Sequence, residues 1–287
     1  LKSVMTSYQL IKQINPRFII GTGGFVCGPV GLAAILAKVP LYLQEQNSFP
    51  GITTRFLGRF ARKVFLGYKA AKVFFSKDNT EYSGNPIQKE KLLSNETINY
   101  EQYGLNKDSL KLLIIGGSQG SLFINNMVLK NLDFILNQGF EVIWQTGKNH
   151  LETIKQQISD RKGVYAFDFT NEMYKLYNSS DIALCRAGAL TLAELEVKKI
   201  PSILVPLPNA AGNHQLRNAR EFQNKGYGIV LEQKLINDFE QIFNLCVENL
   251  NQKKDKFKSC IHMEAASYIC HSISDSMESK GKWEEKC

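Results

Sequence analysis

Short apolar runs alternate along the chain with longer segments whose apolar residues recur every three or four positions. In the second half such runs occupy residues 110–115, 141–145, 164–169, 181–185 and 202–205. Each run is bounded by turn residues and is followed by a segment with helical spacing. A repeated alternation of strand and helix is typical of a parallel, doubly wound sheet. We therefore expect an α/β unit in this part of the chain.

The N-terminal part shows the same alternation in a shorter form, with helical spacing at 3–14 and 30–38 and strands at 17–20 and 40–43. A polar run then separates the two parts of the chain. These shifts predict the domain boundaries, with an N-terminal domain at 1–90, a linker at 91–108 and a C-terminal domain at 109–287. The C-terminal helices are assigned to the second domain, and residues 280–287 are expected to form a frayed tail.

Residues 181–194 combine a buried strand, a glycine turn and the start of a helix. Gly188 permits the sharp turn, and helix formers follow from Ala189 onwards. The free amide groups and the dipole at such a helix start attract a diphosphate. Glu194 lies about a turn and a half into this helix, where it can bind a ribose diol. An ordinary strand, turn and helix remains an equally good interpretation of this stretch alone.

Two other glycine-rich turns follow predicted strands. The turn at 116–120 contains Ser118 near a helix start but lacks the Gly-Lys-Ser/Thr ending of a P-loop. The turn at 21–29 has Val26 where a dinucleotide fingerprint requires its third glycine. No acidic residue follows at the distance that this fingerprint requires, which disfavours a NAD-dependent dehydrogenase.

Polar residues gather after two further strands. Residues 44–47 follow the strand at 40–43, and a polar loop at 206–219 enters a helix near Asn213. Gln215 and Asn218 are expected to face the same sheet edge as Glu194. Ligands of open α/β sheets bind at the carboxyl ends of the strands, so this edge is the expected binding site.

The net charge of +8 and the pI near 9.1 indicate an anionic partner. Residues 55–77 contain Lys and Arg without an acidic residue, and Phe56, Leu57, Phe60 and Val64 lie between them at helical spacing. Such a segment either rests on anionic lipid or forms a solvated basic face over a buried stripe. No nucleic-acid motif accompanies it. No apolar run reaches the roughly 18 residues of a membrane span, so a cytosolic or peripheral location is expected.

The cysteine and histidine pattern does not predict a metal site. The six cysteines form no Cys-x-x-Cys pair, and a cytosolic chain would keep them reduced. Cys260 and His262 lie two positions apart, and Cys270 and His271 are adjacent, on a segment expected to be helical. Residues at these spacings do not face each other on a helix. We therefore expect no metal ion and no cofactor.

Together these motifs resemble the MurG family of peptidoglycan glycosyltransferases. The matching stretches, in the family's order, are 21–29, 45–47 with 50–51, 84–86, 116–120, 186–191 with Glu194, and 214–215 with 218–219. Each stretch alone is a weak signal, but the ordered set is specific. The resemblance implies a GT-B fold, in which two Rossmann-like domains face each other across a cleft.

The resemblance also implies roles for individual residues toward UDP-N-acetylglucosamine. Ser118 would lie near the diphosphate, Thr170 beside the uracil and Gln215 at the sugar hydroxyls, while Asn47 would reach in from the N-terminal domain. The uridine and phosphates would be cradled by Ala189, Leu190, Thr191, Leu192, Ala193 and Glu194. Within this set, Glu194 would hold the ribose hydroxyls.

The implied reaction transfers N-acetylglucosamine, with inversion, to the 4-hydroxyl of N-acetylmuramic acid in undecaprenyl-linked lipid I, forming lipid II. A helix dipole would replace a metal ion at the departing diphosphate. Residues 55–72 resemble the family's membrane-docking region. The expected location is therefore peripheral, on the cytoplasmic side of the bacterial plasma membrane, with no nucleic-acid partner.

The sequence departs from the family pattern at several positions. The family's first glycine loop, Gly-Gly-x-Gly-Gly-His, does not occur in it, and that loop carries the histidine usually proposed as the base. No base is assigned here, and Glu45 is only a distant candidate. Gln44 and Gln88 stand where the family usually has histidine and arginine. Two hypotheses follow: an enzyme that needs the missing loop, or a truncated, non-catalytic remnant that at most binds UDP-sugar.

Overall fold

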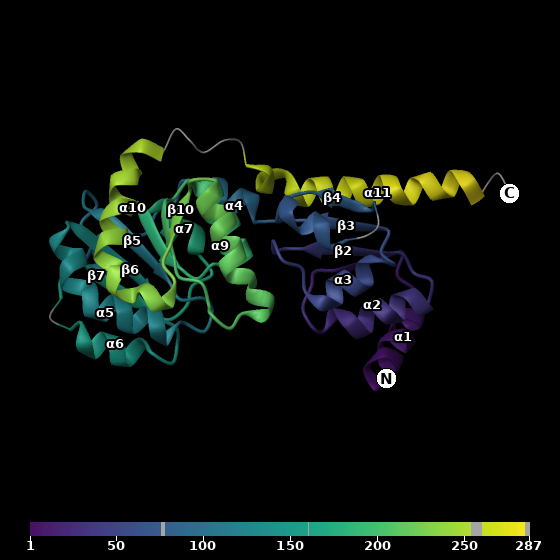
Figure 1. Cartoon of the computed structure of the whole chain (residues 1–287), viewed down its shortest axis with the longest axis horizontal. Coiled ribbons are helices and arrows are strands. Elements are labelled where there is room, and N and C mark those ends of the chain that lie inside the picture. Colours follow the sequence, from purple (N-terminus) through teal and green to yellow (C-terminus); the bar gives the residue numbers. More distant parts are fainter. Residues whose placement is uncertain (76–77, 160, 254–259, 285–287) are drawn as a thin grey trace. The chain divides into compact units, whose positions relative to one another are not determined.

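The computed structural model describes residues 1–75, 78–159, 161–253 and 260–284, and the chain forms two compact units (Figure 1). Unit 1 comprises Leu1–Ile87, Ala210–Arg217 and Ile261–Cys287, and unit 2 comprises Gln88–Asn209 and Asn218–Cys260. Each unit contains one parallel sheet, which confirms the expected α/β fold class. Among the described helices, none is both long enough and apolar enough to cross a membrane.

Unit 1 is built on a four-stranded sheet of order β1-β2-β3-β4. Its strands are β1 (Ile19–Gly21), β2 (Leu41–Glu45), β3 (Lys63–Leu66) and β4 (Thr80–Tyr82). Its helices are α1 (Lys2–Ile14), α2 (Cys27–Leu36), α3 (Ile52–Gly58), η1 (Lys69–Phe74), η3 (Ala211–Asn213), η5 (Ile261–Glu264) and α11 (Ala265–Glu284). Leu41, Leu43, Val64 and Leu66 point to the face covered by α1, α2 and α3. Successive strand residues alternate between faces, so Tyr42 and Phe65 point to the opposite face.

The C-terminal helix α11 covers that opposite face, which corrects its assignment to the second domain. Ile269 and Ile273 pack on Tyr42 and Phe65, and both ring side chains are fully buried. The Tyr42 hydroxyl also donates a hydrogen bond to Ser276 Oγ at 2.9 Å. The strands of unit 1 need an apolar cover on both faces, and this helix supplies the second one. The helix continues to Glu284 through part of the expected tail, and residues 285–287 lie outside the described residues.

A half-buried charge cluster also fastens α11 to the sheet. Lys63 Nζ lies 2.6 Å from Glu81 Oε1 and donates to Ser272 Oγ at 2.8 Å, and Ser272 in turn donates to Glu81 Oε2 at 2.7 Å. Burial acts to raise the pKa of Glu81, but the hydrogen bonds from Lys63 and Ser272 outweigh it, and the pKa is lowered. Lys63 therefore stabilises the packing of α11 on the sheet through its contacts with Glu81 and Ser272.

The basic segment at 55–77 is not one amphipathic helix. Helix α3 ends at Gly58, β3 begins at Lys63, and η1 follows. Val64, Phe65 and Leu66 are buried as consecutive strand residues, because the sheet is covered on both faces. The spacing of Phe56, Leu57, Phe60 and Val64 thus spans two different elements. Lys77 lies outside the described residues.

Unit 2 is built on a six-stranded parallel sheet of order β10-β9-β8-β5-β6-β7. Its strands are β5 (Leu110–Ile115), β6 (Phe140–Gln145), β7 (Val164–Phe167), β8 (Ile182–Cys185), β9 (Ser202–Leu204) and β10 (Gly228–Val230). Its helices are α4 (Lys89–Leu93), η2 (Glu101–Tyr103), α5 (Leu122–Asn137), α6 (Leu151–Gln157), α7 (Met173–Asn178), α8 (Ala189–Lys198), η4 (Gln233–Asp238) and α10 (Phe239–Lys253). Helix α9 (His214–Asn224) begins among the residues of unit 1 and ends among those of unit 2.

The core of unit 2 lies between its sheet and the helices α5, α6 and α10. Trp144 is fully buried there and donates a hydrogen bond from Nε1 to Asn125 Oδ1 at 3.1 Å. Phe239 and Phe243 of α10 pack in the same cluster. This core fixes the strands whose carboxyl ends carry the site described below.

The segment expected as a linker, 91–108, packs on unit 2. Asn178 Nδ2 donates to the carbonyls of Ser94 and Glu96 at 2.7 Å, and the Ile98 amide donates to Ser179 Oγ at 3.0 Å. These bonds fix the segment beside α7. It is thus part of the larger unit rather than a free connection.

Candidate functional site

The strand order of unit 2 reverses between β5 and β8. From β5 the chain moves outward to β6 and β7, and from β8 it moves in the other direction to β9 and β10. Right-handed crossovers place α5 and α8 on opposite faces of the sheet, so a crevice opens where the two strands end. The turns after β5 and β8 are the glycine turns that the sequence singled out.

The turn after β5 is shaped by glycines. Gly117 and Gly120 have φ angles of 90° and 76°, which only glycine adopts readily. A Cβ on Gly120 would lie 2.8 Å from the carbonyl carbon of Thr146 and closer still to its oxygen. Ser121 caps α5, because its Oγ accepts a hydrogen bond from the Ile124 amide at 3.3 Å. Ser118 stands exposed at the tip of the turn.

The turn after β8 leaves the start of α8 open. Gly188 is the N-cap residue in an extended conformation, and no side chain caps the first turn of the helix. The amides of Ala189, Leu190 and Thr191 therefore lie at an uncapped helix start, where the dipole favours an anion.

Three of the predicted cradle residues, Ala189, Leu192 and Ala193, have buried side chains. Leu192 and Ala193 are each only 1% exposed, and the Leu192 amide already donates to the Gly188 carbonyl at 3.0 Å. In an amphipathic helix these positions face the sheet. The part of α8 that can meet a ligand is thus Ala189–Thr191 together with Glu194.

Glu194 is half-buried one turn further along α8. Its Oε2 accepts a hydrogen bond from the Tyr177 hydroxyl of α7 at 2.8 Å. Burial raises the pKa of Glu194, and the bond from Tyr177 acts in the opposite direction. Tyr177 is buried, and its own pKa is raised well above 10.0 by burial and by the nearby carboxylate. No local pattern in the sequence indicates this partner, since the two residues belong to different helices.

Arg186 joins the ends of three strands. Its guanidinium donates to Ser121 Oγ at 2.7 Å and to the carbonyls of Val205 and Pro206 at 3.0 and 3.3 Å. Burial lowers the pKa of Arg186. The residue lies in a motif stretch, yet no role was predicted for it. Its contacts hold the turns after β5, β8 and β9 together.

Thr170 lies in the loop after β7, where its Oγ1 accepts a hydrogen bond from the Glu172 amide at 3.0 Å. It lines a cavity of about 350 Å³. Tyr103 and Tyr165 form a stacked pair in the wall of this cavity, with ring centroids 4.0 Å apart. An aromatic wall of this kind is suited to a flat ring.

The predicted residues Glu45, Asn47 and Gln215 belong to unit 1. Glu45 is 3% exposed, and its Oε1 accepts hydrogen bonds from the Asn47 amide and Asn47 Nδ2 at 3.0 and 3.2 Å. Glu45 therefore fixes Asn47.

Gln44 donates to Asn85 Oδ1 at 3.0 Å, which gives this departure from the family pattern a structural role. Gln215 lies in the first turn of α9, and Gln88 is the N-cap residue of α4.

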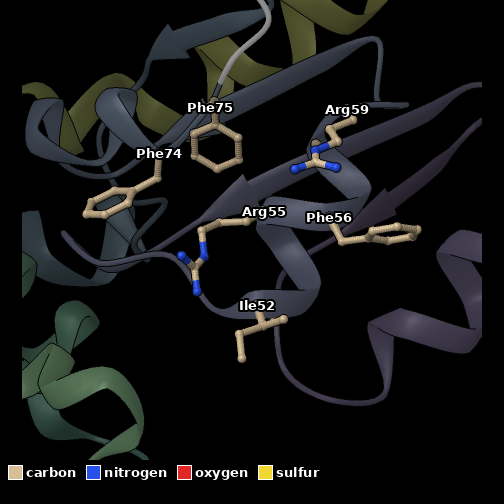
Figure 2. Close-up of a pocket in the computed structure, with 7 residues that line it drawn as sticks. Ile52, Arg55, Phe56, Arg59, Phe74 and Phe75 are labelled. Carbon is tan, nitrogen blue, oxygen red and sulfur yellow. The ribbon is translucent and has the colours of Figure 1, made fainter.

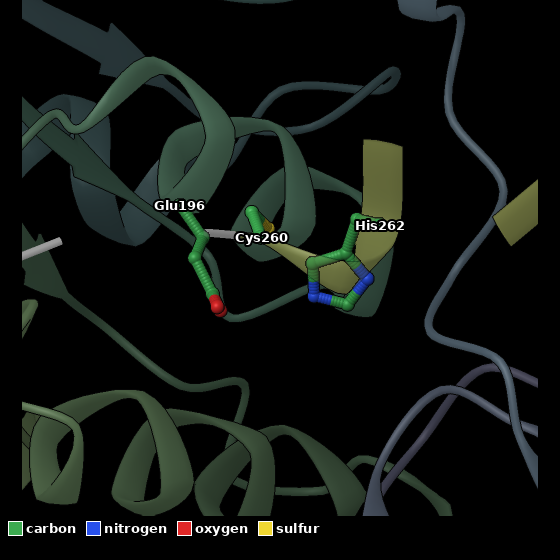
Figure 3. Close-up of side chains that lie close together, drawn as sticks. All are labelled: Glu196, Cys260 and His262. Carbon is green, nitrogen blue, oxygen red and sulfur yellow. The ribbon is translucent and has the colours of Figure 1, made fainter. Parts of the chain in front are cut away.

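Two side chains near the cysteine and histidine positions considered in the sequence, His262 and Glu196, have hydrogen-bond or ion-pair partners. Figure 3 shows His262 of η5 in unit 1, and Glu196 and Cys260 of unit 2. His262 Nδ1 accepts a hydrogen bond from the Asn85 amide at 2.8 Å. Glu196 forms an ion pair with Lys225 at 2.8 Å. Cys287 lies outside the described residues.

A second cavity, of about 370 Å³, lies in unit 1 beside α3 (Figure 2). Arg55, Arg59 and Phe56 of the α3 region line it with Phe74 and Phe75. Among the described residues, no hydrogen-bond acceptor reaches the buried Nε of Arg55. The exposed apolar side chains around this cavity include Ile52, Phe56, Phe60 and Val73.

Some of the cations at 55–72 are already bound within the fold, and others lie at the face beside this cavity. Lys63 is bound to Glu81, and Arg62 donates to the Ser276 carbonyl at 3.2 Å. Arg59 is exposed, and Arg55 lines the cavity over the ring of Phe49 at 5.3 Å. We define the α3 face as Ile52, Arg55, Phe56, Arg59 and Phe60.

Comparisons with known proteins identify the family and the fold of this chain. The glycosyltransferase family 28 C-terminal domain matches residues 111–275, and the N-terminal domain of that family matches residues 1–66. A UDP-N-acetylglucosamine–N-acetylmuramyl-(pentapeptide) pyrophosphoryl-undecaprenol N-acetylglucosamine transferase of Flavobacterium psychrophilum is 35% identical over 90% of this chain and 71% of its own length. The Bacillus subtilis protein of that name is 33% identical over 94% of this chain and 76% of its own length.

The match covers a smaller share of some other relatives. The transferase of the same name from Symbiobacterium thermophilum is 39% identical over 78% of this chain, and the match spans 60% of that relative's length. Among solved structures, Acinetobacter baumannii MurG has a TM-score of 0.71 at 25% identity, covering 96% of this chain and 78% of that protein. A Neisseria meningitidis UDP-GlcNAc 2-epimerase has a TM-score of 0.70 at 14% identity, which shows a shared fold.

Proposed function

We propose that this chain, which belongs to the MurG family of N-acetylglucosaminyltransferases, binds UDP-N-acetylglucosamine at the switch point of unit 2 and transfers its sugar to lipid I. The observation that carries the proposal is the pairing of an uncapped helix start with the half-buried carboxylate of Glu194 on one helix. The first fits a diphosphate, and the second fits a ribose diol. Both lie beside the turn after β5, where β5 and β8 are neighbours.

Each part of the donor has a proposed partner. The diphosphate lies at Ala189–Thr191, with Ser118 of the exposed turn beside it. The uracil lies next to Thr170. For Gln215 the proposed partner is the sugar hydroxyls, as the resemblance to the family implies. The resemblance also assigns Asn47 to the donor, and Glu45 holds the Asn47 amide in place. Leu192 and Ala193 support these groups from the core.

In the proposed reaction the acceptor's 4-hydroxyl attacks the anomeric carbon from the face opposite the diphosphate. The bond between that carbon and the diphosphate oxygen breaks, UDP leaves with the electron pair, and the hydroxyl proton passes to a base. The helix start of α8 stabilises the charge that develops on the diphosphate. Glu45 remains only a distant candidate for this base: it is 3% exposed, and its Oε1 accepts both Asn47 bonds.

A transfer assay tests the reaction. The chain is incubated with UDP-N-acetylglucosamine labelled in the sugar and with a lipid I analogue. We expect label in the lipid product, and about a hundredfold less with Glu194→Ala at donor concentrations below saturation. Donor binding by a folded chain without transfer of label to the acceptor would contradict the proposed transfer.

We further propose that the α3 face docks the chain on an anionic membrane surface, on the side where UDP-sugars are present. The face combines two cations with exposed apolar side chains: Phe56 is 45% exposed and Phe60 is 51% exposed. Cations near an anionic surface each contribute about 1 kcal/mol, and inserted apolar side chains add to this. A lipid-linked acceptor would be reached from this position.

The double variant Arg55→Gln/Arg59→Gln is expected to bind phosphatidylglycerol vesicles about thirtyfold more weakly, since two cations of about 1 kcal/mol each are lost. Vesicle sedimentation measures this. The matched control is Lys2→Gln/Lys12→Gln, which removes the same charge from α1 of the same unit. An equal loss in both double variants would show a response to net charge alone and would contradict a docking face.

A further inference from the structure

The hydrogen bond between Tyr177 and Glu194 joins two helices at the candidate site. Tyr177, on α7, is only 3% exposed, and its hydroxyl donates to Glu194 Oε2 of α8 at 2.8 Å. A phenylalanine would supply the same ring packing. A buried tyrosine hydroxyl requires a partner, and here the partner is the carboxylate assigned to the ribose.

The kind of donor distinguishes Glu194 from its neighbour Glu196. Both oxygens of Glu196 lie close to Lys225 Nζ, at 3.0 and 2.8 Å, which neutralises that carboxylate. Among the described residues, no ion pair involves Glu194, and its hydrogen bond comes from an uncharged hydroxyl. Glu194 thus keeps its negative charge available, with Oε1 left to accept further bonds.

The bond also restricts the rotation of the carboxylate. A glutamate side chain has three rotatable bonds, and fixing one oxygen fixes the direction of the other. Burial disfavours the charged form of Glu194, and a hydrogen bond to the charged form acts against that effect. The remaining titratable group in this cluster is the Cys185 thiol of β8, whose pKa burial raises to about 12, so it stays uncharged at neutral pH.

We propose that Tyr177 is a positioning residue that orients the Glu194 carboxylate toward the ribose hydroxyls of the donor. The proposal rests on the proposed function, since it assigns a ribose to Glu194. Tyr177 itself does not touch the nucleotide. Its effect is therefore expected only for ligands that carry the ribose diol.

The test compares two nucleotides that differ in that diol. UDP and 2′,3′-dideoxy-UDP are titrated calorimetrically into the unmodified chain, Tyr177→Phe and the matched control Tyr174→Phe. Tyr174 lies on the same helix, and its hydroxyl contacts exposed Glu96 at 3.4 Å. Tyr177→Phe is expected to bind UDP about tenfold more weakly, while the affinity for 2′,3′-dideoxy-UDP stays within about twofold. Tyr174→Phe is expected to match the unmodified chain for both.

The outcomes separate the positioning role from the donor site itself. If the unmodified chain does not prefer UDP over the dideoxy nucleotide, the ribose assignment of Glu194 fails. If it does prefer UDP and Tyr177→Phe keeps the full preference, only the positioning role is overturned. An equal loss for both nucleotides would show a general loosening of the fold and would also overturn it.

A double variant tests the proposal in a second way. Adding Tyr177→Phe to Glu194→Ala is expected to change UDP affinity by less than about twofold, because the side chain that Tyr177 orients is already gone. Thermal denaturation reports the folding of each variant separately. A further tenfold loss in the double variant would show that Tyr177 acts independently of Glu194.

Discussion

Glu194→Ala is expected to weaken the binding of UDP-N-acetylglucosamine about a hundredfold. Two hydrogen bonds from the ribose to a carboxylate would be lost, and together they are worth about 3 kcal/mol. The change also removes the partner of the Tyr177 hydroxyl, so thermal denaturation is recorded alongside calorimetric titration. Glu194→Gln retains an acceptor for that hydroxyl and separates the two effects.

Glu196→Ala is the matched control for this variant. Glu196 lies on the same helix, two residues further on, and its carboxylate pairs with Lys225. An ion pair near the surface contributes about 0 to 1 kcal/mol to stability, so donor affinity is expected to remain unchanged. Equal affinity losses in Glu194→Ala and Glu196→Ala would contradict the assigned role of Glu194.

Gly120→Ala is expected to lower the free energy of unfolding by about 3 kcal/mol and to abolish donor binding. The residue has a φ of 76°, and its new methyl group would collide with the Thr146 backbone. The left-handed conformation costs about 1 to 2 kcal/mol for a residue with a Cβ, and overpacking adds about 1 to 3 kcal/mol. Because the collision is with backbone, the turn after β5 must move. Urea denaturation and calorimetric titration measure the two effects.

Gly117→Ala supplies the comparison within the same turn. Gly117 has a φ of 90°, but a Cβ there would meet no atom within 4 Å. We expect Gly117→Ala to lower the free energy of unfolding only by the cost of the left-handed conformation, about 1 to 2 kcal/mol. Similar losses of stability at both glycines would show that the contact with Thr146 does not shape the turn.

The strands β5 to β9 of unit 2 could be predicted from the sequence because each is a short apolar run between turns, whereas the edge strand β10 (Gly228–Val230) was not predicted. The strands found as β5, β6, β8 and β9 lie within or close to the expected runs. Parallel strands buried on both faces have this continuous pattern, and the crossover rules then fix the edge that binds ligands. The turn at Gly188 before a helix was predicted in this way and is confirmed, while the role of Glu194 stays a prediction.

The errors arose where burial depends on elements distant in sequence. Phe56, Leu57, Phe60 and Val64 fitted one helical pattern, but Val64 belongs to the strand β3. The strand is buried on both faces because α11, about two hundred residues later, covers its second face. Because α11 is so far in sequence from the sheet of unit 1, its place in that unit could not be predicted. Tyr177 could not be linked to Glu194, since a contact between helices leaves no periodic signal in either one.

The donor site proposed in unit 2 can be tested by calorimetric titration of the unmodified chain with UDP-N-acetylglucosamine and, separately, with NADH. We expect saturable binding of one UDP-sugar per chain and no binding of NADH. Val26, which stands where a dinucleotide fingerprint requires glycine, argues against NADH binding. The uncapped start of α8 and Glu194 favour the UDP-sugar. A folded chain that binds NADH, or that fails to bind UDP-N-acetylglucosamine, would contradict the donor site proposed in unit 2.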